Sequence, residues 1–193
     1  MNLEQRINNI INEIRDKFDY NKELPLDVFA ESFSCIEIFC RNNNLDSEKS
    51  KFATAVTHYN NDTCESVKYL LIFNSDVWEN TPDNTLKGMV AHELCHFELI
   101  ENIKNYHTRI RNQNEFGDVP IEMINDLFCV NKGFMRELIL CRRHTELKSI
   151  ELFGHDKTEL DIQDFYHCYG LDLHDMERIC KQNKIELEDI ING

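Results

Sequence analysis

The sequence predicts an α+β protein in which a small mixed β-sheet is followed by a mainly helical region. Two segments, 52–59 (FATAVTHY) and 67–73 (VKYLLIF), are rich in β-branched and aromatic residues, which favours strands. From residue 82 onward, apolar residues recur at three- and four-residue intervals, which is typical of amphipathic helices. The 193 residues suffice for one ordinary domain.

The segment up to residue 73 is expected to contain a helix and three strands. Apolar residues at helical spacing over residues 3–18 predict an amphipathic helix. The run at 35–40 (CIEIFC) alternates and carries β-branched and aromatic residues, so it predicts a strand. The Asn60-Asn61-Asp62 cluster predicts a hairpin connection between the two strands named above.

The rest of the chain is expected to be helical. The Thr81-Pro82-Asp83 triplet suits a helix start, and the pattern continues to about residue 103. A polar stretch at 105–118 predicts a loop, after which Pro120 begins a helix that Gly133 can end. Further helices are expected at 134–150, 158–168 and 172–191.

Composition excludes several classes of protein. The formal net charge is −14, whereas a nucleic-acid-binding surface is normally basic, so no nucleic-acid partner is expected. No apolar run approaches the ~18 residues of a membrane span, and the N-terminus lacks the apolar core of a signal peptide. The eight cysteines include no CxxC pair. We therefore expect a cytoplasmic protein with reduced thiols and no membrane partner, and we favour a monomer.

The segment with the clearest chemistry is residues 92–96, His-Glu-Leu-Cys-His. On a helix, His92 and His96 lie one turn apart on the same face, where two imidazoles can bind one Zn²⁺. Glu93 lies beside them and can take a proton from a zinc-bound water, whose pKa the metal lowers toward ~7. The surrounding stretch 88–97 is otherwise uncharged, and a metal would offset the cost of burying these polar groups.

A catalytic zinc needs a third protein ligand and an open fourth position. The helix that begins at Pro120 carries Glu122 and, four residues later on the same side, Asp126. Glu122 can ligate the metal, while Asp126 can accept a hydrogen bond from a ligand histidine. His107 is the alternative third ligand, although its polar surroundings are also typical of an exposed histidine.

Residues 86–97 (LKGMVAHELCHF) and 121–134 (IEMINDLFCVNKGF) together resemble the gluzincin clan of zinc metallopeptidases, and the small size resembles the minimal archaeal gluzincins, or minigluzincins. The resemblance rests on the HExxH motif and the downstream ExxxD pair, about 26 residues in all. It implies a zincin-like domain with one catalytic zinc, an active-site helix and a glutamate helix. Its substrates would be peptides or unfolded proteins.

The resemblance also implies an organisation for the chain. Residues 1–140 would form the catalytic domain, and residues 141–193 a helical extension packed on it that could cover the cleft and keep the enzyme latent. A substrate peptide would pair with an edge strand of the sheet. The segment 67–73, just upstream of the active-site helix, is the best candidate for that edge, with an ordinary core strand as the alternative.

Family members often place a tyrosine or histidine where it stabilises the tetrahedral oxyanion. The sequence does not distinguish among the candidates for this role, which are His144, His155, Tyr166, His167 and His174. Cys95 and Cys129 are expected to be small buried apolar residues.

Two functional interpretations remain open at this point. In the first, the chain is a zinc metalloendopeptidase in which Glu93 activates water, either a general one or one dedicated to a single regulator protein. In the second, it is a zincin-like binding or regulatory module without catalysis. The presence of Glu93 favours the enzyme, because catalytically dead relatives usually lose this residue.

Overall fold

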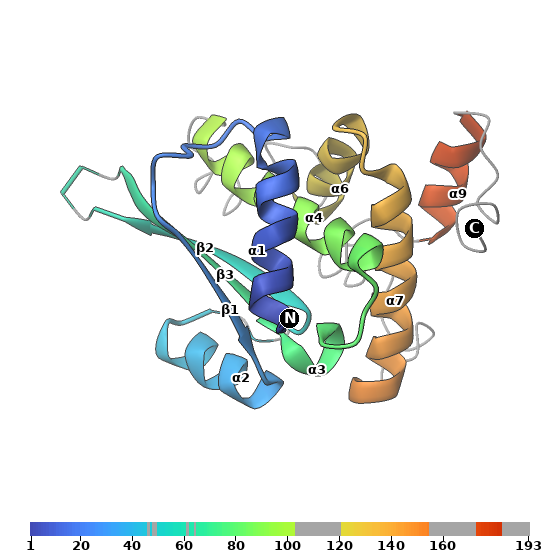
Figure 1. Ribbon diagram of the computed structural model, residues 1–193, viewed down its shortest axis with the longest axis horizontal. Coiled ribbons are helices and arrows are strands. Elements are labelled where there is room, and N and C mark those ends of the chain that lie inside the picture. The colour runs from blue at the N-terminus through green and yellow to red at the C-terminus, as the bar shows by residue number, and fades with distance from the viewer. Residues whose placement is uncertain are drawn as a thin grey trace. The chain divides into compact units, whose positions relative to one another are not determined.

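A computed structural model describes residues 1–102, 121–154 and 173–182, apart from positions 46, 48, 49, 61 and 64. It confirms the predicted α+β class, with a three-stranded mixed sheet followed by helices (Figure 1). By contacts the chain divides into two compact units. Met1–Asp83 and Glu93–Tyr106 form unit 1, and Asn84–His92 and His107–Gly193 form unit 2.

Unit 1 begins with helix α1 (Leu3–Ile14), which a 3-10 turn continues to Lys17. Asn2 caps its start and exchanges hydrogen bonds with Gln5, so two backbone N–H groups that the helix leaves free are satisfied. The predicted apolar stripe is buried, at Leu3, Ile7, Ile10, Ile11 and Ile14. The helix predicted over 3–18 is therefore confirmed along most of its length.

The sheet has the strand order β1-β3-β2. Strand β1 (Leu26–Glu31) runs parallel to β3 (Ser66–Asn74), and β2 (Ala53–Tyr59) runs antiparallel to it. The strands predicted at 52–59 and 67–73 are confirmed. Strand β1 was not predicted, because its alternation of Leu26, Val28 and Ala30 with other residues is short and directly follows a proline.

The expectation that segment 67–73 forms an edge strand is wrong. Strand β3 is hydrogen-bonded on both sides and is therefore the central strand. Its residues are buried from Tyr69 to Asn74, as expected for a continuous apolar run covered on both faces. The expectation rested on nearness in sequence to the motif helix, which does not determine the lateral order of strands.

The strand predicted at 35–40 is also wrong, because this segment lies in helix α2 (Phe33–Asn42). Ile36 and Cys40 are buried four residues apart, whereas Cys35 and Ile38 are exposed. The buried pair packs against Leu70 and Ile72 of β3, so tertiary contact selected the helical period over the alternating one.

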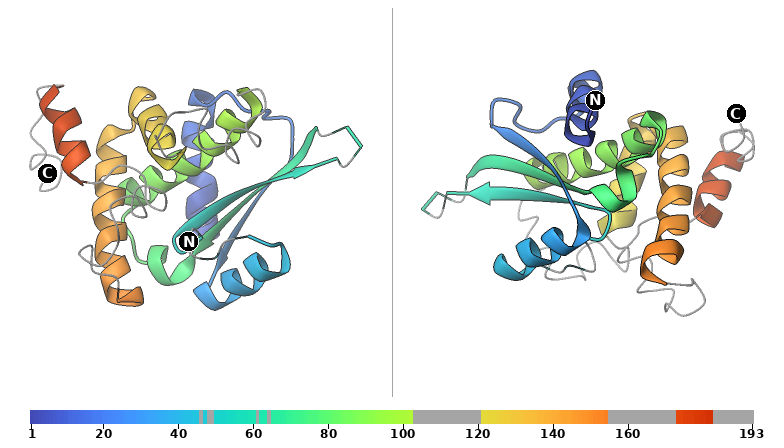
Figure 2. Two further views of the ribbon diagram at one scale, coloured as in Figure 1. Left: turned by 180° about the vertical axis from the view of Figure 1, so that it is seen from behind. Right: turned by 60° about the horizontal axis from the view of Figure 1, so that its bottom comes forward.

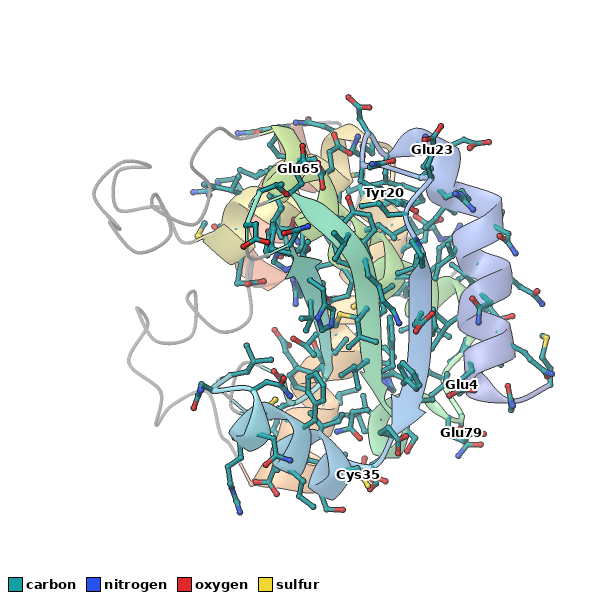
Figure 3. All side chains as sticks on the ribbon, turned by 90° about the vertical axis from the view of Figure 1, so that its left-hand side faces the viewer. Glu4, Tyr20, Glu23, Cys35, Glu65 and Glu79 are labelled. Atoms are coloured by element: carbon teal, nitrogen blue, oxygen red, sulfur yellow. The ribbon has the colours of Figure 1, made fainter. Side chains whose placement is uncertain are left out.

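Helices cover both faces of the sheet (Figure 2). On the face opposite α2, Tyr69 of β3 stacks against Phe97, with ring centroids 4.4 Å apart, and meets Tyr20 edge-on. Helix α1 is tied to β1 through Glu4, whose carboxylate accepts a hydrogen bond from the backbone of Ala30 (3.2 Å; Glu4 and Tyr20 are labelled in Figure 3). The short helix α3 (Ser75–Trp78) follows β3.

Helix α4 (Asp83–Asn102) confirms the predicted motif helix and contributes to both units. Unit 2 also contains α6 (Ile121–Asn131), α7 (Met135–Phe153) and α9 (Leu173–Gln182). Gly133, which follows α6, and Gly154, which ends α7, have φ angles of 87° and 67° that favour glycine. The loop expected at 105–118, the helix at 158–168 and the last part of the helix at 172–191 lie outside the described residues.

The expected domain boundary after residue 140 stays a prediction, and residues 140 and 141 both lie within α7. In the part of the chain that the structure describes, no helix is both long and apolar enough to cross a lipid bilayer.

Within unit 2, α4 and α7 approach closely at Gly88. A Cβ atom built on Gly88 would lie 2.2 Å from the carbonyl oxygen of Glu137 and 2.7 Å from Cβ of Cys141. Only a residue without a side chain fits there, so Gly88 sets the separation of the two helices.

We expect Gly88→Ala to destabilise the protein by about 1–3 kcal/mol, because the methyl group would push against backbone that cannot rotate away. Urea denaturation measures the change. Asn84→Ala, at an exposed position on the same helix, is the control and should change the free energy of unfolding by less than about 0.5 kcal/mol. Equal stabilities of the two variants would show that the contact with α7 is not constraining.

Candidate metal centre

Helix α4 carries the first three residues of the candidate centre, His92, Glu93 and His96. The four-residue spacing puts the two imidazoles one turn apart on one face of this helix. His92 and Glu93 are each 4% exposed, whereas His96 is only partly buried. The apolar residues around the motif are buried as predicted, at Met89, Val90, Ala91, Leu94, Cys95 and Phe97.

Glu122 lies in the first turn of α6, where the positive end of the helix dipole favours a carboxylate. Its Oε2 is 2.9 Å from Nε2 of His92. One ligand atom each from His92, His96 and Glu122 lies within 4.8 Å of the others. The structure thus brings together the three residues that the sequence singled out, and these three can hold a metal ion.

The other ring nitrogen of His92 is held from α6. Nδ1 lies 2.7 Å from Oδ1 of Asp126, which is completely buried. The neighbouring Asn125 donates a hydrogen bond from Nδ2 to the backbone carbonyl of His92 (2.7 Å). Two adjacent residues of α6 therefore position both the ring and the backbone of His92.

Arg142 of α7 completes this network, although no motif in the sequence points to it. Its Nη2 and Nε donate to Oδ1 and Oδ2 of Asp126 at 2.6 and 3.0 Å. The side chain is buried, on the helix face that also buries Leu138, Cys141 and Thr145. The sequence does carry one signal for a buried and paired arginine here: Arg142 falls in an otherwise weakly polar stripe at helical spacing.

These contacts determine which nitrogen of His92 is protonated. Burial favours a neutral Asp126, but the charges of Arg142 and His92 outweigh it and lower the pKa of the carboxyl below its usual value. An ionised Asp126 can only accept, so the 2.7 Å contact requires a proton on Nδ1. Nε2 is then the nitrogen left to face Glu122 and a metal.

The same groups set the charge of His92 when no metal is bound. Burial opposes the charged imidazole, but the charge of Asp126 and hydrogen bonds to Asp126 and Glu122 outweigh it and raise the pKa of His92 to about 10. The metal-free ring is thus a cation that bridges two carboxylates, and a metal ion would replace the proton on Nε2.

The donor set fits zinc. Two imidazole nitrogens and one carboxylate oxygen are ligands that Zn²⁺ takes in catalytic sites, where the fourth position stays open. The hydrogen bond from Nδ1 to Asp126 is the support that a ligating histidine commonly has.

Several predicted residues have no described placement. His107, the alternative third ligand, lies outside the described residues, as do His155, Tyr166 and His167. His174 lies in α9, where its side chain is not described, and His144 is a partly exposed residue of α7. An oxyanion-stabilising tyrosine or histidine therefore stays a prediction. Cys95 and Cys129 are completely buried, as expected.

Comparison of the chain with models of known protein families, with curated proteins and with solved structures finds no match.

The raised pKa of His92 predicts how the stability of the metal-free protein changes with pH. The folded state holds a proton that the unfolded state loses above pH ~6.5, so this contribution is fully present below that pH and is lost as the pH rises toward 10. We expect the free energy of unfolding in EDTA to fall by up to about 1.4 kcal/mol per pH unit within this window.

The informative quantity is the difference between wild type and His92→Gln, because this difference isolates the contribution of His92. Urea denaturation from pH 6.5 to 9.5 should show a steeper decline for wild type. Parallel curves would mean that His92 does not carry this proton.

Proposed function

We propose that this protein is a zinc-dependent metallopeptidase of the gluzincin type, with His92, His96 and Glu122 as the metal ligands and Glu93 as the general base. The observation that carries the proposal is the cluster of three ligand atoms within 4.8 Å of one another, from two helices that also supply Glu93 and Asp126. A bound zinc would act as a Lewis acid that polarises the scissile carbonyl and lowers the pKa of a water.

The residues of the centre would then have different roles in the reaction. Glu93 accepts a proton from the attacking water and donates it to the leaving amine. Asp126 keeps the Nδ1 proton of His92 in place, so that Nε2 offers its lone pair throughout the reaction. His96 and Glu122 are partly exposed, so these two side chains are the part of the centre that solvent reaches.

One observation favours a second function, that of a non-catalytic metal-binding module. Glu93 is only 4% exposed, whereas a general base must reach water. In this case His92, His96 and Glu122 would bind a structural metal. Glu93 would then have a structural role among the buried side chains and no catalytic one. A peptidase dedicated to one regulator protein is a variant of the first function and would fail with general peptide substrates.

Zinc content tests the ligand set. We expect about one zinc per chain in the wild type and loss of most of it in His96→Ala and Glu122→Ala, because each removes one of three ligands. Elemental analysis after dialysis measures this. His58→Ala, which removes an exposed histidine of β2, is the matched control and should keep its zinc.

If Glu122→Ala keeps its zinc and His107→Ala loses it, then His107 is the third ligand. Wild-type protein that takes up no zinc would overturn the proposal.

Glu93→Gln separates the two functions, since it keeps the shape of the side chain but removes the base. We expect it to bind zinc as wild type does and to lose peptide hydrolysis by about 10²–10⁴-fold, the usual contribution of a general base. The measurement is cleavage of a mixed peptide library, read by mass spectrometry.

Glu151→Gln, an exposed glutamate of α7, is the control and should keep full activity. Undiminished cleavage by Glu93→Gln would exclude the proposed mechanism. Zinc-loaded wild type that cleaves neither peptides nor unfolded proteins would favour the binding module or the dedicated peptidase.

A further inference from the structure

We propose that Arg142 is a positioning residue of the metal centre, which acts through Asp126 to direct Nε2 of His92 at the metal. The inference rests on the metal binding in the proposed function but not on peptide hydrolysis. It concerns a residue that the motifs at 92–96 and 122–126 do not include.

The geometry of the contact supports this role. Arg142 binds both carboxylate oxygens of Asp126, with Nη2 2.6 Å from Oδ1 and Nε 3.0 Å from Oδ2. Such a two-point contact fixes the plane of the carboxylate, which a single donor does not. Because Oδ1 also accepts the Nδ1 proton of His92, the orientation of the imidazole follows from the orientation of this carboxylate.

Arg142 also lies directly beside the histidine. Its Nη2 is 3.1 Å from Nδ1 of His92, and both atoms are donors to Oδ1 of Asp126. All three side chains are buried. Water therefore does not replace a lost contact easily, and a carboxylate freed from Arg142 could turn away from His92.

The backbone brings Arg142 to this place. Gly88 lies one turn before His92 and allows the backbone carbonyl of Glu137 and the Cβ atom of Cys141, both in α7, to approach α4 closely. Cys141 is the residue before Arg142, so the same helix contact that excludes a side chain at position 88 places the guanidinium near the ring of His92. A continuous series of contacts therefore runs from Arg142 in α7 through Asp126 in α6 to His92 in α4.

The inference predicts that zinc affinity depends on Arg142 only while Asp126 is present. We expect Arg142→Met to weaken zinc binding by about 10–100-fold, the usual effect of losing a group that orients a ligand. In an Asp126→Asn background, the same substitution should weaken binding by less than about 3-fold.

The experiment is a double-mutant cycle. Zinc affinity is measured by competition with a chromophoric chelator for wild type, for each single variant and for the double variant. Circular dichroism confirms that each protein is folded, and Arg143→Met, at the exposed neighbouring position, is the matched control that should bind zinc as wild type does.

A role limited to folding would give another result. Arg142→Met would then lose thermal stability but bind zinc within about 3-fold of wild type, or the effects of Arg142→Met and Asp126→Asn on zinc affinity would multiply. Either result would overturn the inference.

If Arg142→Met does not fold, Arg142→Lys is the variant to measure. Lysine keeps a positive charge beside Asp126 but binds only one carboxylate oxygen at a time. We expect it to weaken zinc binding by about 10-fold and to shift the visible absorption of the cobalt-loaded protein. An unchanged affinity and spectrum would count against the inference.

The outcomes keep the two proposals apart. Zinc affinity that depends on Arg142 through Asp126, in a protein that cleaves neither peptides nor unfolded proteins, would support this inference and count against a general peptidase. Peptide hydrolysis with a zinc affinity that is indifferent to Arg142 would do the reverse.

Discussion

A fully buried carboxylate must be paired, because an uncompensated charge in the interior costs several kcal/mol. Asp126 meets this constraint with donors from two other helices, Nδ1 of His92 in α4 and the guanidinium of Arg142 in α7. One side chain thereby links α4, α6 and α7. The position of His92, and with it the chemistry of the centre, follows from the need to pair this charge.

The centre has a buried inner part and a more accessible outer part. His92, Asp126 and Arg142 are buried and bound to one another, whereas His96 and Glu122 are partly exposed. Such a gradient holds one candidate ligand rigidly and leaves the other two within reach of solvent. Glu93 belongs to the buried part by exposure, so a catalytic role depends on water reaching it from the side of His96 and Glu122.

Helix α4 is anchored at both of its ends by different means. In unit 1, Phe97 stacks on Tyr69, and Glu101 accepts a hydrogen bond from the hydroxyl of Tyr69 (2.6 Å). In unit 2, Gly88 permits the close approach of α7. The motif lies between these anchors, and the apolar residues on either side of it keep the helix buried. The backbone that carries the two histidines is therefore held in place.

The sequence by itself determined the features that depend on neighbours along the chain. The four-residue spacings of His92 with His96 and of Glu122 with Asp126 need only a helix to place each pair on one face, and strands 52–59 and 67–73 follow from local composition. Only the tertiary structure decided the rest. It made 35–40 a helix by packing Ile36 and Cys40 on β3, put β3 in the middle of the sheet, and brought Arg142 to Asp126. The reason is that strand order and ion pairs between helices depend on contacts between distant segments, which local periodicity does not encode.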